Sequence, residues 1–294
     1  QRIKGLSLST AIKFALFPNS KKRPKTLVDE FYYPKLGAGM LWEKFEDSII
    51  NNGISIIKDS PVEEINKTKD GLEIIYKEKE KRVTIKTKNI FFSNPLLEFI
   101  KIFNTEIPEE VYKEANKLDY RNHISVHLTI DKKLFDDNWI YVHSPELKLA
   151  RISDFTNFSE LMSANNEFPL TLEYFCFEND EIWNSSNQEI INFALTELKA
   201  IFRVEFNILH SEVSRNAKAY PVIQTGFENS INIIKSWLKT QSEITAIGRS
   251  GMFKYNNQDH AMATGIYAAR NYLGIGKYDP WEVNVDGEYQ EEIK

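Results

Sequence analysis

The amino-acid sequence predicts a mixed α/β fold of the α+β kind, with two strand-rich blocks separated and followed by helices. Segments whose apolar residues alternate fall into two blocks, and segments with a helical apolar period lie between and after them. The composition agrees, because 42% hydrophobic and 27% charged residues are ordinary for a globular protein. A length of 294 residues allows one large domain or two smaller ones.

The first strand-rich block follows two predicted helices. We expect the first helix at residues 8–17, a loop at 18–25, and a second helix that starts at Leu41 and stops at Gly53. Leu41, Phe45 and Ile49 share one face of that second helix. Short alternating strands are then expected at residues 54–57, 62–66, 72–76, 82–86 and 90–93.

The second block begins after a helical pattern at residues 98–118. It contains four expected strands, one extended segment and one helix. The strands are at 123–130, 139–143, 149–155 and 170–177, the helix at 187–202, and the extended segment at 212–222. A helix at 226–239, a short strand at 244–248 and a last helix at 259–273 complete the chain.

The bulk properties exclude several classes of function. A net charge of -5 argues against a general nucleic-acid binder, which carries a basic surface. No apolar run approaches the length of a membrane span, and no signal peptide opens the chain. The single cysteine, Cys176, forms no internal disulfide, which is typical of a cytoplasmic protein. His123 and His127 lie in a strand-like run, so they lack the spacing of a helical zinc pair, and we expect no metal site.

The most informative segment runs from residue 246 to residue 270. A buried strand ends at Gly248, a polar loop follows, and a helix begins near Asn257 and Gln258. The unpaired N–H groups at a helix start favour an anion, such as a phosphate or the electron-rich edge of a reduced flavin. The alternative from spacing alone is that Asn257 and Asp259 only cap the helix.

This segment resembles the C-terminal flavin-binding signature of the UDP-galactopyranose mutases. The matching residues are Gly248, Arg249, Tyr255, Asn257, Gln258, Asp259 and His260. The resemblance implies FAD as the cofactor, with Arg249 beside the flavin and Tyr255 reaching a substrate diphosphate. It also implies that the helix start around Asp259 covers the flavin or its ribityl chain.

Two further segments carry the same resemblance. The run Arg151-Ile-Ser-Asp-Phe-Thr-Asn-Phe-Ser159 is similar to the mutase segment whose arginine contacts the nucleotide-sugar diphosphate. The planar fork of Arg151 suits that role, and a surface or interdomain ion pair is its alternative. The run Tyr33-Pro-Lys-Leu-Gly-Ala-Gly-Met40 resembles an element near the flavin in amine-oxidase-like and protoporphyrinogen-oxidase-like proteins. That likeness implies a cofactor contact at Gly37, Gly39 and Met40.

The Gly-x-Gly-x-x-Gly unit that holds the ADP half of FAD does not occur in the sequence. The chain also opens at Gln1 rather than at a methionine. We therefore expect a fragment that lacks the N-terminal nucleotide-binding unit and binds flavin weakly unless that unit is supplied.

The resemblance implies interleaved domains. Residues 31–95 and 226–294 would form the FAD side, and residues 96–225 with the helical part at 1–30 would form the substrate side. The active site would lie between them and take a small-molecule substrate of the nucleotide-sugar kind. Lys218 and Tyr220 are further candidates for substrate binding, and Arg215 is the nearest candidate for an additional diphosphate-binding arginine.

Three functions remain open at this point. In mutase-type chemistry the reduced flavin attacks the anomeric carbon of the sugar, so the protein need only position the sugar and neutralise the diphosphate. A true oxidoreductase, which removes hydride from an amine or a ring carbon, would use the same flavin signature. The third alternative is a non-catalytic remnant that binds no flavin.

Overall fold

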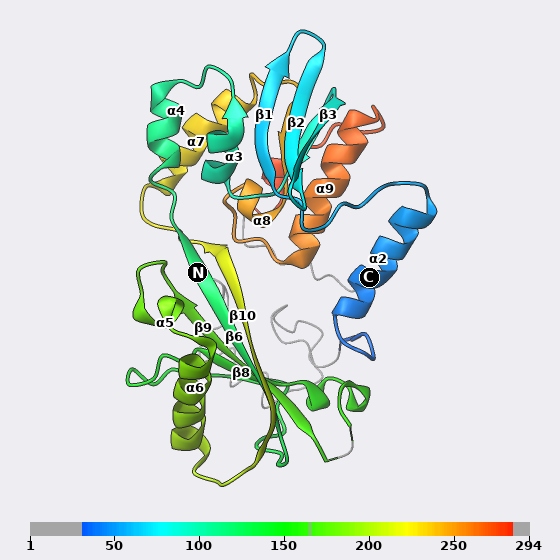
Figure 1. Ribbon diagram of the computed structural model, residues 1–294. Coiled ribbons are helices and arrows are strands. Elements are labelled where there is room, and N and C mark those ends of the chain that lie inside the picture. Colours follow the sequence, from blue (N-terminus) through cyan, green and yellow to red (C-terminus); the bar gives the residue numbers. More distant parts are fainter. Residues whose placement is uncertain (1–30, 165, 285–294) are drawn as a thin grey trace, which may run out of the picture. The chain divides into compact units, whose positions relative to one another are not determined.

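The computed structural model describes residues 31–164 and 166–284 (Figure 1). The chain divides into two compact units, one of residues 33–255 and one of residues 1–32 with 256–294. Each is described by itself. The helix expected at residues 8–17 lies outside the described residues.

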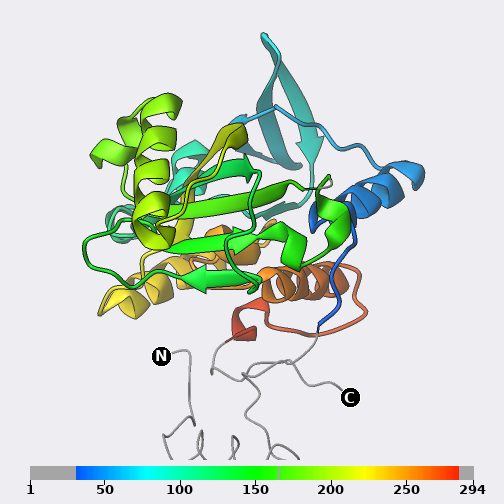
Figure 2. The ribbon, with the colours of Figure 1, turned by 90° about the horizontal axis from the view of Figure 1, so that it is seen from below.

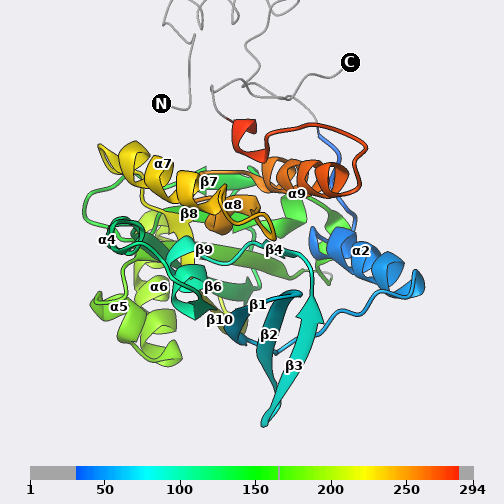
Figure 3. The same ribbon diagram turned by 90° about the horizontal axis from the view of Figure 1, so that it is seen from above.

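The first part of the larger unit is a helix followed by an antiparallel meander. After α2 (Gly39–Asn51), the strands β1 (Val62–Thr68), β2 (Gly71–Glu78) and β3 (Lys81–Thr87) pair in order. The two-residue β5 (Phe103–Asn104) adds in parallel beside β1. Figure 3 shows β1, β2 and β3 as neighbours. The sheet order is therefore β3-β2-β1-β5.

The strand expected at residues 54–57 is wrong. The structure has no strand there, and the isoleucines at 54, 56 and 57 are 59%, 39% and 48% exposed. Apolar residues alone do not make a strand, because the backbone N–H and C=O groups need a partner strand. The described residues provide none for this segment.

The helical pattern expected at residues 98–118 is found, but in two pieces rather than as one continuous run. The structure has two short helices, α3 (Leu96–Ile102) and α4 (Glu109–Ala115), with β5 between them. Pro108 precedes α4, and a proline disfavours the helical conformation of the residue before it. The chain therefore leaves the helix after α3 and starts a new one at Glu109.

A short parallel pair lies beside these helices in the same unit. Strand β4 (Ile90–Phe92) pairs with β11 (Ile244–Ala246), which follows α7 (Phe227–Leu238). The helix α7 packs against α4, where the Ser230 hydroxyl donates to the buried Glu114 carboxylate at 2.7 Å. Parallel strands run in the same direction, so the carboxyl ends of β4 and β11 meet at one edge.

The large sheet of this unit has five antiparallel strands in the order β10-β6-β9-β8-β7. Their bounds are β6 (Tyr120–Ile130), β7 (Trp139–Tyr141), β8 (Arg151–Asp154), β9 (Phe168–Cys176) and β10 (Ile208–Pro221). Two 3₁₀ turns, η1 (Phe155–Asn157) and η2 (Glu160–Met162), follow β8.

One face of the large sheet is closed by helix α6 (Asn187–Phe202), with the short α5 (Glu181–Asn184) before it (Figure 2). A reciprocal cap between Ser186 and Glu189 starts α6. Its buried residues join the alternate residues of β6 and β9 in one hydrophobic cluster. The opposite face of the same strands is polar.

The smaller unit contains α9 (Gln258–Tyr272) and the 3₁₀ turn η3 (Pro280–Glu282). The Asn271 side chain donates to the Tyr278 carbonyl at 2.6 Å and accepts from the Tyr278 N–H at 2.8 Å. The Tyr278 ring stacks on Tyr267 at 4.6 Å. These contacts fold the chain after α9 back onto the helix.

Candidate functional site

The site is built around a tight turn at the end of β11. Gly248 has a φ of +76°, a backbone conformation that is strained for residues with a side chain. It opens the one-turn helix α8 (Gly248–Gly251). A Cβ on Gly251 would lie 2.8 Å from the Phe92 carbonyl oxygen, so only glycine lets this turn close onto the end of β4. The turn fixes the backbone of Arg249, whose carbonyl also accepts from the Lys254 N–H at 3.0 Å.

The Arg249 guanidinium lies against two tyrosine rings. Its Cζ atom is 4.0 Å from the ring centroid of Tyr220 and 4.4 Å from that of Tyr255. The two centroids are only 5.8 Å apart, so the rings form a corner around the cation and do not sandwich it. Contact with ring faces stabilises a cation and fixes the plane of its fork. Burial raises the pKa of Tyr220 and the positive charge of Arg249 opposes this, so Tyr220 stays a neutral phenol at neutral pH.

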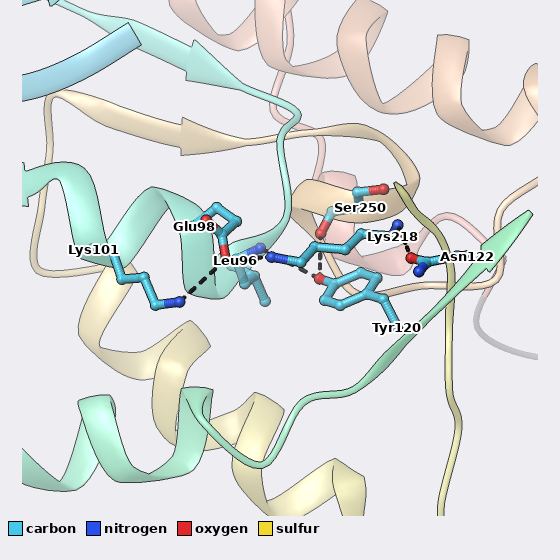
Figure 4. A network of polar contacts seen from close by, with 7 residues as sticks. All are labelled: Leu96, Glu98, Lys101, Tyr120, Asn122, Lys218 and Ser250. Carbon is cyan, nitrogen blue, oxygen red and sulfur yellow. Dashed lines mark hydrogen bonds and ion pairs between the residues drawn. The ribbon is translucent and has the colours of Figure 1, made fainter. Parts of the chain in front are cut away.

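A bulge in β10 brings Tyr220 to this corner. The register of β10 against β6 shifts between Asn216 and Tyr220, and Lys218 within the shift has a φ of +53°. The Asn122 side chain accepts from the Lys218 N–H at 2.9 Å and so holds the bulge (Figure 4). The Lys218 ammonium forms an ion pair with Glu98 of α3 at 2.5 Å, and this pair links β10 to α3.

Tyr120, the first residue of β6, forms hydrogen bonds with both α8 and α3. Its hydroxyl donates to the Ser250 carbonyl of α8 at 3.0 Å and accepts from the Leu96 N–H of α3 at 3.3 Å (Figure 4). Burial raises the pKa of Tyr120 well above its ordinary value, so the phenol keeps the proton that it donates. The large sheet, α3 and α8 are therefore joined through one side chain.

The polar face of the large sheet carries a group of ionisable side chains. Arg151 of β8 donates through Nη2 to Oε1 of Glu173 on β9 at 2.7 Å, and the same nitrogen forms an ion pair with Oε2 at 2.6 Å. Nε2 of His123 on β6 lies 3.9 Å from Oε1 of the same carboxylate. The His123 ring is 5.3 Å from Phe175 and 6.0 Å from Tyr220, which extends the group to the Arg249 corner.

The two histidines of β6 differ in the hydrogen bonds of their ring nitrogens. Both ring nitrogens of His127 have hydroxyl partners, Thr171 at 2.9 Å and Ser214 at 3.2 Å. Nε2 of His123 is buried and has no hydrogen-bond partner among the described residues. Burial lowers the pKa of both histidines, so both rings are neutral near pH 7.

Arg215 lies on the opposite face of the sheet. It pairs in register with Ile124 of the apolar face, and it donates to the Ser185 carbonyl at 2.6 Å and to the Asn187 side chain. Successive residues of a strand point to opposite faces, so Arg215 does not join Arg151 and Arg249.

The glycine-containing segment before α2 contacts the chain that follows β8. Tyr33 packs on Phe158 at 4.7 Å, and the Ser159 hydroxyl donates to the Lys35 carbonyl at 2.7 Å. Gly37, at a φ of +95°, would place a Cβ 3.0 Å from the Cε of Met162. Gly39 and the half-buried Met40 open α2, and a Cβ on Gly39 would meet nothing within 4 Å. Two of the three segments with the family resemblance are thus in contact.

The residues expected at the last helix start belong to the smaller unit. Asn257 is the N-cap of α9, and its N–H donates to Nδ1 of the buried His260 at 3.2 Å. Asn257, Gln258 and Asp259 are exposed. Within this unit, Asn257 and His260 therefore cap the start of α9.

Sequence reasoning missed Glu173 and gave His123 no role beyond excluding zinc. The available signal is the alternation His123-x-Ser125-x-His127-x-Thr129, in which polar residues interleave with isoleucine, valine and leucine. Such a strand has one apolar face and one polar face. Within residues 31–164 and 166–284 no cluster could hold a metal ion and no helix is long and apolar enough to cross a membrane.

Comparison with known proteins reveals fold relatives among solved structures. A reduced UDP-galactopyranose mutase aligns with a TM-score of 0.72 and 16% identity, over 84% of this chain and 54% of its own. A protein named as a protoporphyrinogen oxidase from Exiguobacterium sp. 255-15 aligns with a TM-score of 0.58 and 15% identity, over 73% of this chain and 46% of its own. A putrescine oxidase redesigned in its cofactor binding aligns with a TM-score of 0.55 and 11% identity, over 81% of this chain and 53% of its own.

These matches confirm the amine-oxidase-like fold class expected from the sequence. The chain spans about half the length of these structures. No protein-family model matches the chain, and no curated protein matches it.

Proposed function

We propose that the chain is the substrate-binding and flavin-facing part of an FAD-dependent enzyme that acts on a nucleotide sugar or a similar diphosphate. The observation that carries the proposal is the Arg249 corner, a cation fixed by two tyrosines at the carboxyl edge of two parallel strands. Ligands of open α/β sheets bind at that edge. The likeness to UDP-galactopyranose mutase and to two oxidases supports the flavin assignment.

The residues present fit the flavin half of FAD. Gly248 and Gly251 keep the turn beside β4 free of side chains, and the planar fork of Arg249 can lie against a flat ring or donate to its electron-rich edge. The ADP half needs a Gly-x-Gly-x-x-Gly unit, which the 294 residues lack. The whole cofactor is therefore expected to bind only when a nucleotide-binding segment joins the chain.

The chain's own residues would bind and orient the substrate. A bound flavin supplies a nucleophilic ring nitrogen when reduced, or a hydride acceptor when oxidised. Arg249 would offset negative charge next to the reacting centre, and the phenol of Tyr255, which is 37% exposed, would donate to a phosphate oxygen. Arg151 would take a second phosphate oxygen on the polar face of the sheet.

A specific observation favours the second candidate, a hydride-removing oxidoreductase. The charge of Arg151 is offset by Glu173, so the polar face is less positive while this ion pair persists. An amine or another neutral substrate would suit a face of that charge. Redox demand separates the two reactions, because a mutase with reduced flavin consumes no electron acceptor and an oxidoreductase consumes one equivalent per product.

The first test is the visible absorption spectrum of the purified chain before and after addition of FAD, beside a version extended upstream. A shifted, structured flavin band in the extended version supports the proposal. The absence of such a band in both versions would favour the third alternative, a non-catalytic remnant that packs against a partner.

A further inference from the structure

Glu173 lies between two possible cationic partners on the polar face of the large sheet. Its carboxylate oxygens lie 2.6–2.7 Å from Nη2 of Arg151. Nε2 of His123 lies 3.9 Å from Oε1 of the same carboxylate and has no hydrogen-bond partner among the described residues. A charged N–H to carboxylate contact closes at about 2.8 Å. A movement of roughly 1 Å would therefore give His123 the ion pair that Arg151 now holds.

A charge on Glu173 or His123 needs a partner of opposite charge on this face. The Glu173 and His123 side chains are only 11% and 12% exposed, so a charge there is poorly solvated and needs a partner. A substrate phosphate that engages Arg151 would replace Glu173 as its counter-charge. The displaced carboxylate would then be buried and unpaired unless His123 became its cation.

We propose that His123 is a positioning residue, which takes one proton from solvent and accepts the ion pair of Glu173 when a diphosphate group engages Arg151. Substrate binding and proton uptake are then coupled, so affinity for the diphosphate rises as the pH falls. The inference rests on the proposed function for its ligand, but the exchange of partners can be tested without any ligand.

The charged and titratable groups around His123 are consistent with this exchange. Burial lowers its pKa most, the carboxylate of Glu173 raises it, and the charges of Arg151 and His127 lower it. Tyr220 of β10 faces the ring as a neutral phenol, and Arg249 of α8 lies behind that phenol. When a bound phosphate offsets the charge of Arg151, that charge no longer lowers the pKa of His123, and the carboxylate of Glu173 raises it.

The ligand-free experiment removes the charge of Arg151 and measures His123 directly. The substitution Arg151→Met keeps an unbranched apolar stem without the charge, and Arg151→Gln serves as a second variant should the first fold poorly. Resonances of the imidazole C–H groups, followed by NMR through a pH titration, report each of the five histidines. We expect the pKa of His123 to rise by about one unit, and that rise to vanish when Glu173→Gln is added.

His127 is the matched control, because it lies on the same strand and face with both nitrogens already bonded. Its pKa should move far less than that of His123, and near-UV circular dichroism should show that the variants keep their packing. A His123 pKa that stays unchanged or falls in Arg151→Met would overturn the exchange.

The ligand experiment uses UDP-galactose, whose diphosphate bridge has no group that titrates near neutral pH. Calorimetry in two buffers of different ionisation enthalpy counts the protons taken up on binding. We expect uptake approaching one proton, with affinity rising by up to about tenfold per unit of falling pH. His123→Gln should abolish the uptake, and His127→Gln should keep it.

The outcomes separate the two proposals. Binding without proton uptake overturns the exchange and leaves the diphosphate proposal intact. No binding at any pH overturns the diphosphate proposal, and the histidine titration still decides whether Glu173 changes partner.

Discussion

The two faces of the large sheet are made by alternate residues of the same strands, and they are held in different ways. Along β6, Ile124, Val126 and Leu128 are at most 1% exposed and pack under α6. Between them, Ser125 is 6% exposed and His127 is bonded to two hydroxyls. The first face is stabilised by loss of contact with water, and the second by completed hydrogen bonds and ion pairs.

The two faces differ in how far packing explains their residues. On the apolar face most buried residues are aliphatic and are accounted for by packing, with the Tyr174 hydroxyl as an exception. On the polar face a buried atom without a partner needs another explanation, because leaving it so costs about 1–3 kcal/mol. Nε2 of His123 is such an atom, and it lies near the Arg249 corner.

The largest expected effect comes from breaking the apolar face. Leu128→Ala should lower the free energy of unfolding by about 3 kcal/mol, because it removes buried methyl groups and leaves a cavity. Urea denaturation followed by circular dichroism measures this. Thr129→Ala, the next residue on the polar face, should cost less than about 1 kcal/mol. Equal losses for the two variants would contradict the division into faces.

A smaller loss is expected when the polar face loses its central carboxylate. Glu173→Gln should lower the free energy of unfolding by about 2 kcal/mol, because the half-buried Arg151 keeps its charge without the charged partner. Glu212→Gln is the control, since it changes an exposed carboxylate opposite His127 on the same face. Its effect should be near zero, and a larger loss there than at position 173 would refute the assigned role of Glu173.

The bulge of β10 is expected to contribute about 1 kcal/mol. Asn122→Ala removes the acceptor of the Lys218 N–H, so the bulge should loosen and Tyr220 should lose its fixed place against Arg249. Near-UV circular dichroism detects the tyrosine change, and Asn216→Ala at an exposed position of the same strand is the control. An unchanged tyrosine signal in Asn122→Ala would show that the bulge needs no side-chain support.

The smallest effect is a pH dependence of stability. Burial lowers the pKa of His123 and His127 below 6.5, so at pH values below 6.5 the unfolded chain binds more protons than the folded chain. The free energy of unfolding is therefore highest above pH 6.5, falls as the pH drops from 6.5 toward the lowered pKa values, and levels off below them. Urea denaturation at several pH values should show this slope in the natural chain and a flatter one in the double variant His123→Gln/His127→Gln. A slope of the opposite sign would contradict buried neutral histidines.

The regular elements were predictable where period and boundary signals agree. Helix α6 has the expected bounds, 187–202, because Ser186 and Glu189 provide a cap before a clear apolar period. The strand expected at 54–57 is absent, because local pattern does not show whether a partner strand exists. The helical pattern at 98–118 is present, but the pattern alone did not show that it divides into α3 and α4. The mixed α/β class was correct because it depends on many segments together.

The candidate site was most predictable where one segment carries the signal, as for Arg249 and Tyr255. Tyr220, a further candidate from another segment, is brought to both of them by the structure. The pairing of Arg151 with Glu173 spans 22 residues and depends on strand register, which the sequence alone does not specify. The same holds for His123, whose neighbours come from β8, β9 and β10.

The most direct test of the account is the affinity for FAD of the extended chain, measured by titration of its visible absorption, in the natural form and in Arg249→Ala. Arg82→Ala, in the exposed salt bridges of the meander, is the control. The account predicts a structured flavin band, about tenfold weaker binding in Arg249→Ala, and an unchanged affinity in Arg82→Ala. Equal affinity in all three forms, or no bound flavin in any, would contradict the assignment of the Arg249 corner as a flavin site.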